Sequence, residues 1–385
     1  MAARVLFLSA SVGVGHTAAA RAVEGALRAR DPSVCSETVD SYAYAASIFA
    51  KVVADGYIGM VKTVPQVYRY LYGRVERSRE VPALRRAVGR FAASNLRALV
   101  ASERPDLIVC THAFPCGVMA EYKRHFDPSV KVVGVVTDFV VHPFWIYGEV
   151  DAYAVATPEM AACLHARGIA PERIVISGIP IDPRFGQARL SREQLRDELR
   201  LPRDRRIVLV MGGGVGLGPL ERIMRALDRV RTPIAAAVIV GRNPGLERRV
   251  LAAAERTSYP LRVYGFVDNV HDFMHASDVL ISKPGGLTSA EALAAGLPMV
   301  LVRPLPGQEE RNAEYLVSRG AALRAPDDER LAARVEEVFA GGEPAWALRS
   351  RIAQMRRPDA ARQVAERLAG LLAPQLLAGV PAYLR

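Results

Sequence analysis

The segment 279–298 reads VLISKPGGLTSAEALAAGLP, and it shows the pattern that decides the fold of the chain. Its first four residues predict a buried parallel strand, after which two glycines turn the chain. A helix begins near Thr288, so its free N–H groups and its dipole would face an anion such as a phosphate. Thr288 and Glu291 have the spacing of a capping box, which is a purely structural role, but Glu291 could instead bond ribose hydroxyls.

The same strand–helix alternation extends in both directions along the chain. Further strands are predicted at 5–8, 107–110, 132–136, 174–176, 207–211, 234–240, 261–264 and 299–302. Helices are predicted at 17–30 and at 158–167, where Thr157 is a suitable N-cap and Pro158 occupies the first turn. Alternation of this kind implies an α/β protein with doubly wound parallel sheets and right-handed crossovers.

A proline-rich connector divides this pattern into two series. Residues 179–185 read IPIDPRF, and their prolines suit a stiff linker. We therefore expect two Rossmann-like domains facing a cleft, one at 1–180 and one at 186–345, followed by a helical tail at 346–385. Ligands of such sheets bind at the carboxyl ends of the strands, so candidate site residues are sought there.

The composition excludes several classes of protein. The chain has 385 residues, of which 50% are hydrophobic and 24% charged, and this excludes a disordered or collagen-like protein. Lys and Arg number 51 against 40 Asp and Glu, and the net charge of +11 predicts attraction to anionic surfaces or phosphorylated substrates. The four cysteines form no CxxC motif or Cys/His cluster, so we interpret them as reduced thiols of a cytoplasmic protein.

Two stretches resemble membrane segments. The apolar stretch at 5–14 has some features of a signal peptide, but Gly13 interrupts it, and a strand entering a glycine loop explains it better. The uncharged stretch at 368–384 contains Pro374 and Pro381, which make it a poor spanning helix. No membrane-spanning segment is therefore predicted.

The loop after the first strand carries a glycine motif and a histidine. Residues 9–18 read SASVGVGHTA, which contains the dinucleotide fingerprint GxGxxA, and Asp40 at the end of the predicted second strand could bond a ribose. The glycines also serve simply to turn the chain. His16 is suited to act as a general base near neutral pH, although a histidine at a helix start can also merely cap or pack.

Two polar loops follow strand ends in the second half. The loop MGGGVGLG at 211–218 presents successive backbone amides to an anion, so we expect Gly213 and Gly214 to contribute to ligand binding. It matches neither GxGxxG nor a Walker A motif. In RPLPGQEERN at 303–312, Gln308 and Glu309 open a helix and could bind sugar hydroxyls, because hydrogen bonds to a carboxylate are strong.

Four motifs taken together resemble those of the diacylglycerol glycosyltransferases. They are SxSxGxGH near the start, TDFxxHPxW at 137–145, GFVDN at 265–269 and KPGGLTxxEALAxGLPxxxxxPxPGQExxN at 283–312. Over about residues 4–320 the chain is similar to the monogalactosyl- and glucosyl-diacylglycerol synthases. These are UDP-sugar transferases of the GT-B fold, related to the N-acetylglucosaminyltransferase that makes lipid II.

The resemblance implies a donor site in the second domain and a lipid acceptor site in the first. Donor roles fall on the diphosphate ligands Gly285, Gly286 and Thr288, the ribose ligand Glu291, the uracil contact Val267 through its backbone, and the sugar ligands Gln308 and Glu309. On the acceptor side, His16 would be the base or an acceptor ligand, and Asp138 is a second candidate base. Gly15, His142 and Trp145 would bind the acceptor, but residues 146–147 depart from the Phe-His of plant members.

The chemistry of such a transfer agrees with these residues. A base takes the proton of the attacking hydroxyl, while helix-terminal amides stabilise the charge on the departing UDP. A single displacement inverts the anomeric centre. The chain has no DxD motif, and His271 and His275 lack both the glutamate of HExxH and a third ligand. We therefore expect transfer from UDP-glucose or UDP-galactose without a metal or another cofactor.

Residues 41–97 have a composition that suits binding to a membrane surface, where a lipid acceptor would be found. Tyrosines at 42, 44, 57, 68, 70 and 72 are followed by arginines at 74, 77, 79, 85, 86, 90 and 97. Tyrosine rings and clustered arginines suit a lipid headgroup interface, although a solvated basic helix over a tyrosine-rich core has the same composition. We expect a peripheral protein at the anionic inner face of the cell membrane, acting on a diacylglycerol-type lipid and not on nucleic acid.

Three other functions use parts of the same sequence. A UDP-N-acetylsugar epimerase would have a similar fold but would need no lipid surface. An NAD-dependent oxidoreductase would use the GxGxxA loop and Asp40, but it leaves the segment 283–312 without a role. A non-catalytic module that binds a nucleotide sugar or a lipid is the third alternative.

Overall fold

The computed structural model describes residues 2–10, 14–44, 94–213 and 219–378. The chain forms two compact units, which are described separately. The N-terminal unit consists of Met1–Ile181 together with Pro306–Gln308 and Asp359–Arg385, and the C-terminal unit consists of Asp182–Leu305 and Glu309–Pro358.

The N-terminal unit is built on a six-stranded sheet in the order β2-β1-β3-β4-β5-β6, and all its neighbouring strands are parallel. The strands are β1 (Arg4–Ser9), β2 (Cys35–Asp40), β3 (Leu107–Cys110), β4 (Lys131–Val135), β5 (Ala152–Val155) and β6 (Ile174–Ile176). Strands β3, β4 and β5 are almost wholly buried, because helices cover both faces of such a sheet.

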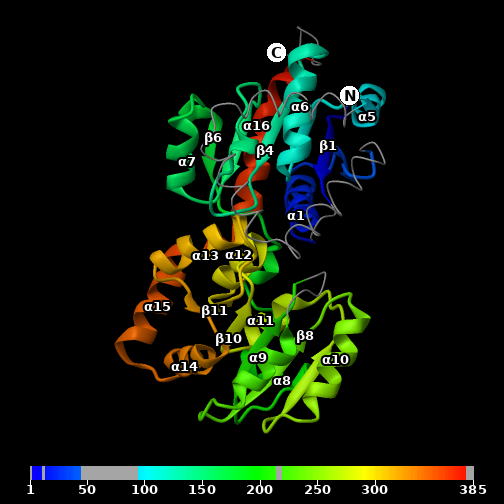
Figure 1. Cartoon of the computed structure of the whole chain (residues 1–385). Helices are drawn as coiled ribbons and strands as arrows, with labels where there is room; N and C mark the ends of the chain where they lie inside the picture. Colours follow the sequence, from blue (N-terminus) through cyan, green and yellow to red (C-terminus); the bar gives the residue numbers. More distant parts are fainter. Residues whose placement is uncertain (1, 11–13, 45–93, 214–218, 379–385) are drawn as a thin grey trace. The chain divides into compact units, whose positions relative to one another are not determined.

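Helices from both ends of the chain cover the N-terminal sheet. They are α1 (Val14–Arg30), α5 (Ser94–Glu103), α6 (Ala113–His125), α7 (Pro158–His165) and α16 (Ala360–Ala378), with short helices η1 (Pro143–Trp145) and η2 (Pro171–Arg173). Figure 1 shows α16, in red, beside α1, in blue. Val364 and Leu368 of α16 are buried in the same apolar cluster as Phe7 of β1, so the last helix completes the core of this unit.

The C-terminal unit repeats the architecture with the strand order β12-β11-β10-β7-β8-β9. Its parallel strands are β7 (Arg206–Met211), β8 (Ile234–Ile239), β9 (Leu261–Tyr264), β10 (Val279–Ser282), β11 (Met299–Val302) and β12 (Leu323–Ala325). The helices are η3 (Pro183–Phe185), α8 (Arg192–Glu198), α9 (Leu220–Leu227), α10 (Pro244–Ala254), α11 (Val270–Ala276), α12 (Gly286–Ala295), α13 (Gln308–Ser318), α14 (Asp328–Phe339) and α15 (Gly342–Met355).

The α/β class and the two parallel, doubly wound sheets confirm the prediction from the strand–helix alternation. The predicted strands at 107–110, 174–176, 261–264 and 299–302 have the observed bounds of β3, β6, β9 and β11. Thr157 caps α7 as expected, because its side chain accepts a hydrogen bond from Met160 N. Strands β5 and β12 were not predicted, since β5 contains two alanines and β12 an arginine, so neither is a run of β-branched residues.

Two helix starts differ from the prediction. Helix α1 already begins at Val14, so His16 lies in its first turn rather than in a loop. Helix α12 begins at Gly286 with Gly285 as its N-cap, so the capping box that was the structural alternative for Thr288 and Glu291 does not form. The glycines allow the chain to enter the helix earlier, which moves Glu291 into the second turn and frees its carboxylate from a capping role.

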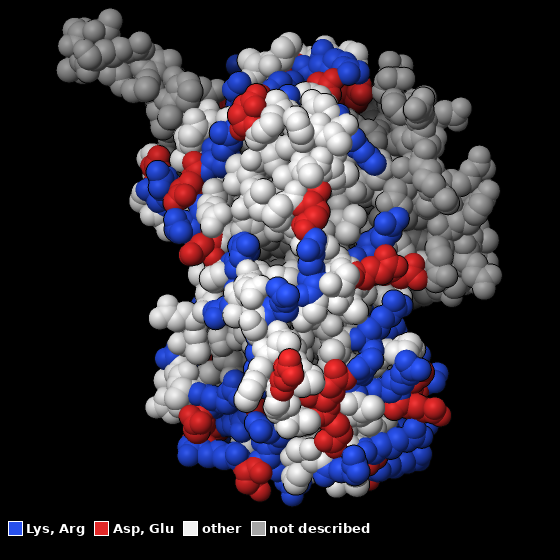
Figure 2. Space-filling model, turned by 90° about the vertical axis from the view of Figure 1, so that its left-hand side faces the viewer, with Lys and Arg blue, Asp and Glu red and all other residues white. Residues whose placement is uncertain are grey.

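Two features of the structure relate to the predicted contact with a membrane: the length and hydropathy of its helices, and the charges on its surface. No described helix is both long and apolar enough to cross a bilayer. Figure 2 shows Lys and Arg interspersed with Asp and Glu over the described part of one face. On that face the excess of positive charge is therefore not gathered in a single patch.

Candidate active site

The candidate catalytic residues of the N-terminal unit follow three strands at their carboxyl ends. His16 lies in the first turn of α1, after β1, and Thr111 directly follows β3. Thr137 and Asp138 lie just beyond β4. Because the strands are parallel, these residues share one edge of the sheet, which is where ligands of such folds bind.

Two contacts orient the ring of His16. Its Nδ1 lies 3.0 Å from the carbonyl oxygen of Thr111 and 2.9 Å from Thr137 Oγ1. A carbonyl can only accept a hydrogen bond, so this network assigns the ring proton to Nδ1. The other nitrogen, Nε2, then keeps its lone pair and is able to accept a proton from a ligand.

The surroundings of His16 keep its ring neutral but make protonation feasible. Burial lowers the pKa of His16 below its usual value, while the carboxylate of Asp138 opposes this effect. A neutral imidazole is the form that acts as a base. Once the ring has taken a proton, the negative charge of Asp138 stabilises it, so the structure brings the two candidate catalytic residues together.

The sequence analysis missed His112, which packs against His16. The two rings meet edge to face with 4.7 Å between their centroids. His112 is the N-cap of α6 and its Nδ1 accepts a hydrogen bond from Phe114 N at 3.1 Å. Burial, together with the neighbouring His16, holds the pKa of His112 well below its usual value. Its position two residues after a predicted strand end was the signal that could have identified it.

The predicted acceptor residues lie on two elements of the same unit. Gly15 is in the first turn of α1. His142 is the N-cap of η1, where its Nδ1 accepts a hydrogen bond from Phe144 N at 3.3 Å, and Trp145 ends that short helix. Trp145 is only 2% exposed. Their roles as acceptor ligands stay predictions.

A buried tyrosine ties down the segment that follows η1. The hydroxyl of Tyr153, on β5, donates to the carbonyl of Trp145 at 2.7 Å and accepts from Tyr147 N at 2.8 Å. Burial raises the pKa of Tyr153 well above its usual value, so the group remains a hydroxyl that can both donate and accept. The Tyr153 hydroxyl thus fixes the backbone of Trp145 and Tyr147, at the point where the sequence departs from the Phe-His of plant members.

We expect Tyr153→Phe to raise the KM for the lipid acceptor about tenfold, because a hydrogen bond lost in a buried site costs about 1–3 kcal/mol. The affinity for UDP should not change. Tyr259→Phe is a matched control, since the Tyr259 hydroxyl is also buried and donates to the carbonyl of Met224 in the other unit. An acceptor KM that is equal in wild type and Tyr153→Phe would contradict the prediction.

The candidate donor residues of the C-terminal unit begin at the start of α12. Gly285 caps the helix with ordinary dihedral angles, φ −64° and ψ 138°, so another residue could adopt this conformation. A Cβ built on Gly285 would meet no atom within 4 Å. Ser289, in the first turns of the helix, is buried, and its hydroxyl has no hydrogen-bond partner among the described residues. The N–H groups of the first turn have no partner within the helix, and together with the open space at Gly285 and the unsatisfied hydroxyl of Ser289 they suit an anion.

Glu291 lies one turn further along α12, half-buried. Burial, with a smaller contribution from the charge of Asp182, raises the pKa of Glu291 to about 8. A carboxyl group with this pKa changes its charge near physiological pH and is often found at a functional site. Because α12 has no side-chain cap, Glu291 has no capping role that would compete with binding of a ligand.

The two predicted sugar ligands start helix α13. Gln308 is its first residue. The carboxylate of Glu309 bonds within its own unit: Oε1 lies 3.3 Å from Lys283 Nζ, and Oε2 accepts from Leu305 N at 2.7 Å. Glu309 therefore holds together the loops that follow β10 and β11, and direct binding of a sugar by this residue stays a prediction.

The remaining donor residues follow β7 and β9. Gly213 has φ +74°, a left-handed conformation that favours glycine, and Gly214 lies outside the described residues. Val267 lies in the loop between β9 and α11. In that loop the ring of Phe266 is 46% exposed and is covered by the guanidinium of Arg242, which is 4.0 Å from its centroid.

The two histidines of α11 have local contacts. His271 packs edge-on against Phe185, and His275 Nε2 lies 3.0 Å from the carbonyl oxygen of Arg184. Within residues 2–10, 14–44, 94–213 and 219–378, no group of three His, Cys, Asp or Glu side chains is arranged to hold a metal.

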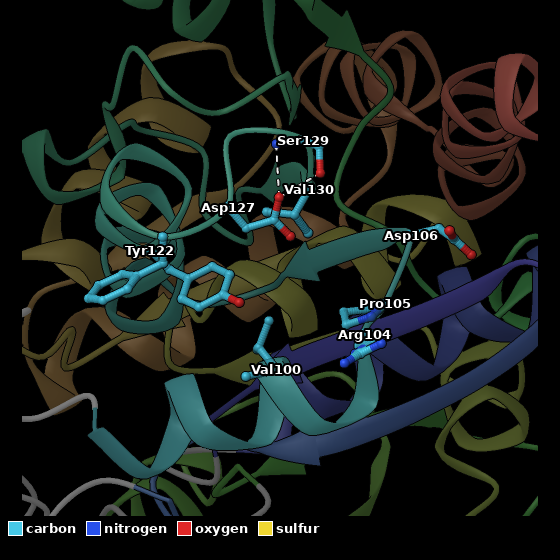
Figure 3. A pocket seen from close by; sticks show the side chains of 10 residues that line it. Val100, Arg104, Pro105, Asp106, Tyr122, Asp127, Ser129 and Val130 are labelled. Atoms are coloured by element: carbon cyan, nitrogen blue, oxygen red, sulfur yellow. Dashed lines mark hydrogen bonds between the residues drawn. The ribbon is translucent and has the colours of Figure 1, made fainter.

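A cavity of about 440 Å³ lies elsewhere in the N-terminal unit. Figure 3 shows it between α5 and α6, where Val100 and Tyr122 line it, and next to the loops that lead into β3 and β4. Arg104 and Val130 mark the amino ends of these strands. The candidate residues His16 and Asp138 follow the carboxyl ends of the strands, so this cavity is separate from the candidate site.

Two known protein families match most of the chain. Residues 16–181 match the monogalactosyldiacylglycerol (MGDG) synthase family, and residues 207–364 match the C-terminal domain of glycosyltransferase family 28. A processive diacylglycerol beta-glucosyltransferase of Bacillus cereus is 31% identical over 341 residues, which are 87% of this chain and 85% of that protein.

Solved structures share the fold at low sequence identity. MurG of Acinetobacter baumannii has a TM-score of 0.61 at 15% identity and covers 96% of this chain and 99% of its own. A UDP-GlcNAc 2-epimerase of Neisseria meningitidis has a TM-score of 0.58 at 10% identity, with 96% and 100% covered. Transferases and epimerases thus share this fold, and the fold alone does not distinguish their reactions.

The fold and the sequence matches together define a glycosyltransferase of the GT-B class. The chain belongs to the family of diacylglycerol glycosyltransferases, which includes the MGDG synthases and the processive diacylglycerol glucosyltransferases. This confirms the resemblance carried by the four motifs. It also favours glycosyl transfer over the epimerase and oxidoreductase alternatives.

Proposed function

We propose that this glycosyltransferase moves glucose from UDP-glucose to diacylglycerol and inverts the anomeric centre. The similarity to the Bacillus cereus diacylglycerol beta-glucosyltransferase over most of both chains carries the proposal. The name of that protein describes it as processive. We therefore extend the proposal to repeated transfer, in which the glycosylated lipid serves again as acceptor.

The acceptor is activated by His16. Its Nε2 takes the proton of the acceptor hydroxyl as the hydroxyl oxygen forms a bond to the anomeric carbon. The free Nε2 lone pair supports this role, because Nδ1 is held by Thr111 and Thr137. Asp138 stabilises the imidazolium that results. A positioned base of this kind accelerates a reaction by about 10²–10⁴-fold.

The donor is bound at the start of α12. The bond between the anomeric carbon and the diphosphate oxygen breaks as the acceptor attacks, so negative charge accumulates on the leaving UDP. The N–H groups of the first turn of α12, from Gly286 onward, and the helix dipole stabilise that charge. Glu291 accepts hydrogen bonds from the ribose hydroxyls, and it is the stronger acceptor when it is ionised.

The reaction takes place at the surface of an anionic membrane, to which the protein binds peripherally at the cytoplasmic side. The net charge of +11 supports attraction to such a surface. Most of the tyrosine- and arginine-rich stretch 41–97, to which we assign this contact, lies outside the described residues.

A transfer assay tests the proposed function. The full chain is incubated with diacylglycerol in mixed micelles and with radiolabelled UDP-glucose, UDP-galactose or UDP-GlcNAc, and the label in the organic phase is counted. We expect the highest kcat/KM with UDP-glucose and a β-linked product by NMR. An α-linked product would refute inversion, and label that stays in the aqueous phase with every donor would refute lipid glycosylation.

A further inference from the structure

Three aromatic rings form a wall beside the proposed base. Tyr42 stacks on Phe114 with 5.3 Å between centroids and meets His112 at 5.9 Å. His112 in turn packs against His16 at 4.7 Å. All three wall residues are half-buried, so part of each ring is exposed. The wall is built from the segments that follow β2 and β3, at the same sheet edge as the proposed base.

The wall also carries hydrogen-bonding groups. His112 Nδ1 accepts from Phe114 N, which leaves the proton of the neutral ring on Nε2 as a donor. Asp40, the last residue of β2, accepts from Tyr42 N at 3.1 Å and is half-buried next to the wall. The surface thus combines flat apolar rings with an N–H donor and a carboxylate acceptor.

This combination is more than the first acceptor requires. The reactive end of diacylglycerol is a single hydroxyl on a short glycerol unit, and His16 alone can contact it. A hexose, by contrast, has an apolar face of C–H groups and a rim of hydroxyls. The apolar face gains free energy by packing on aromatic rings, and the hydroxyls need partners once they leave water.

We propose that Tyr42, His112 and Phe114, together with Asp40, form an acceptor subsite for the sugar ring of an already glycosylated lipid. The inference rests on the proposed function, and it names the residues that would hold the sugar of the acceptor during repeated transfer. A sugar on this wall lies next to His16, so one of its hydroxyls is placed for proton transfer. The subsite thus favours a second transfer over release of the product after the first.

Acceptor competition tests the subsite with the full chain and UDP-glucose. The acceptors are diacylglycerol and glucosyl-diacylglycerol in identical mixed micelles, and kcat/KM is measured for each. We expect Tyr42→Ala to lower the ratio of kcat/KM for the glucosylated acceptor to that for diacylglycerol about tenfold, through lost packing with the sugar. Tyr42→Phe should restore the ratio, because it restores the ring.

Phe126→Ala is the matched control, because Phe126 is an aromatic residue of the same unit and is 62% exposed. It is the C-cap of α6, whereas His112 is the N-cap, so the two residues lie at opposite ends of this helix. It should leave the ratio unchanged. Equal loss on both acceptors in Tyr42→Ala, or no change in the ratio, overturns the subsite. A wild-type protein that glycosylates diacylglycerol but not glucosyl-diacylglycerol also overturns it and leaves single transfer standing. If neither lipid is glycosylated, the proposed function fails as well.

Discussion

His16→Ala is expected to lower kcat for glucosyl transfer by about 10²–10⁴-fold, which is the usual contribution of a positioned general base. The ring is held by Thr111 and Thr137 with Nε2 left to accept the proton, so alanine removes the base without disturbing a helix cap. The affinity for UDP should stay the same, because the proposed diphosphate and ribose ligands on α12 belong to the other unit. Radiolabel transfer and calorimetry with UDP measure the two quantities.

A matched control and a pH profile sharpen this test. His125→Ala removes an exposed histidine at the end of α6 and should retain full activity. In the wild type, the acid limb of kcat/KM should have an apparent pKa below 6.5, since burial lowers the pKa of His16. Normal turnover by His16→Ala would remove this residue from the mechanism.

Glu291→Gln is expected to weaken UDP binding about 10–100-fold above pH 8, since hydrogen bonds to a charged group contribute about 1.5–3 kcal/mol. The pKa of Glu291 is about 8, so the wild-type carboxyl becomes ionised, and a better acceptor for ribose hydroxyls, as the pH rises through this value. Between pH 7 and pH 9, calorimetry should show wild-type affinity increasing and the affinity of Glu291→Gln staying flat. Glu343→Gln, an exposed substitution on α15, is the control.

The raised pKa of Glu291 also predicts how the stability of the folded protein depends on pH. The folded protein binds the proton of Glu291 more tightly than the unfolded chain does, whose glutamates have pKa values near 4.5. Stability from this group is therefore complete below pH 4.5 and is lost as the pH rises to about 8. Glu291→Gln abolishes this loss, so at pH 8 it should unfold at a higher temperature than wild type. Parallel pH dependence in the two proteins would contradict the assigned pKa.

The strands could be predicted because the sequence signal of a buried parallel strand lies within the strand itself. Buried parallel strands are continuous apolar runs, and for this reason β3 and β10 could be located from their own residues. The strand β5 was not predicted because two of its four residues are alanines, which favour a strand less than the Ile and Val of β3. The packing of α16 against the N-terminal unit depends on the apolar surface of a sheet that is far away in sequence, so no periodicity within α16 could reveal it.

Those residues of the candidate site that follow predicted strands could be identified from the sequence, because ligands of parallel sheets bind at the carboxyl ends of the strands. His16 and Asp138 follow predicted strands, and the structure places them in electrostatic contact. His112 satisfied the same rule but carried no motif, and it was overlooked. The bonds of Glu309 to Lys283 and Leu305 depend on how two loops approach each other, which residue types alone do not specify.

The diphosphate site at the start of α12 is tested most directly by calorimetric titration of UDP into Gly285→Val and wild type. Valine fits the backbone angles of Gly285, and a Cβ at this position meets no atom within 4 Å, so the melting temperature should change by only a few degrees. If the nucleotide occupies that open space, the side chain displaces it, and UDP should bind at least about tenfold more weakly. Equal heats and equal affinities in the two proteins would show that UDP binds elsewhere.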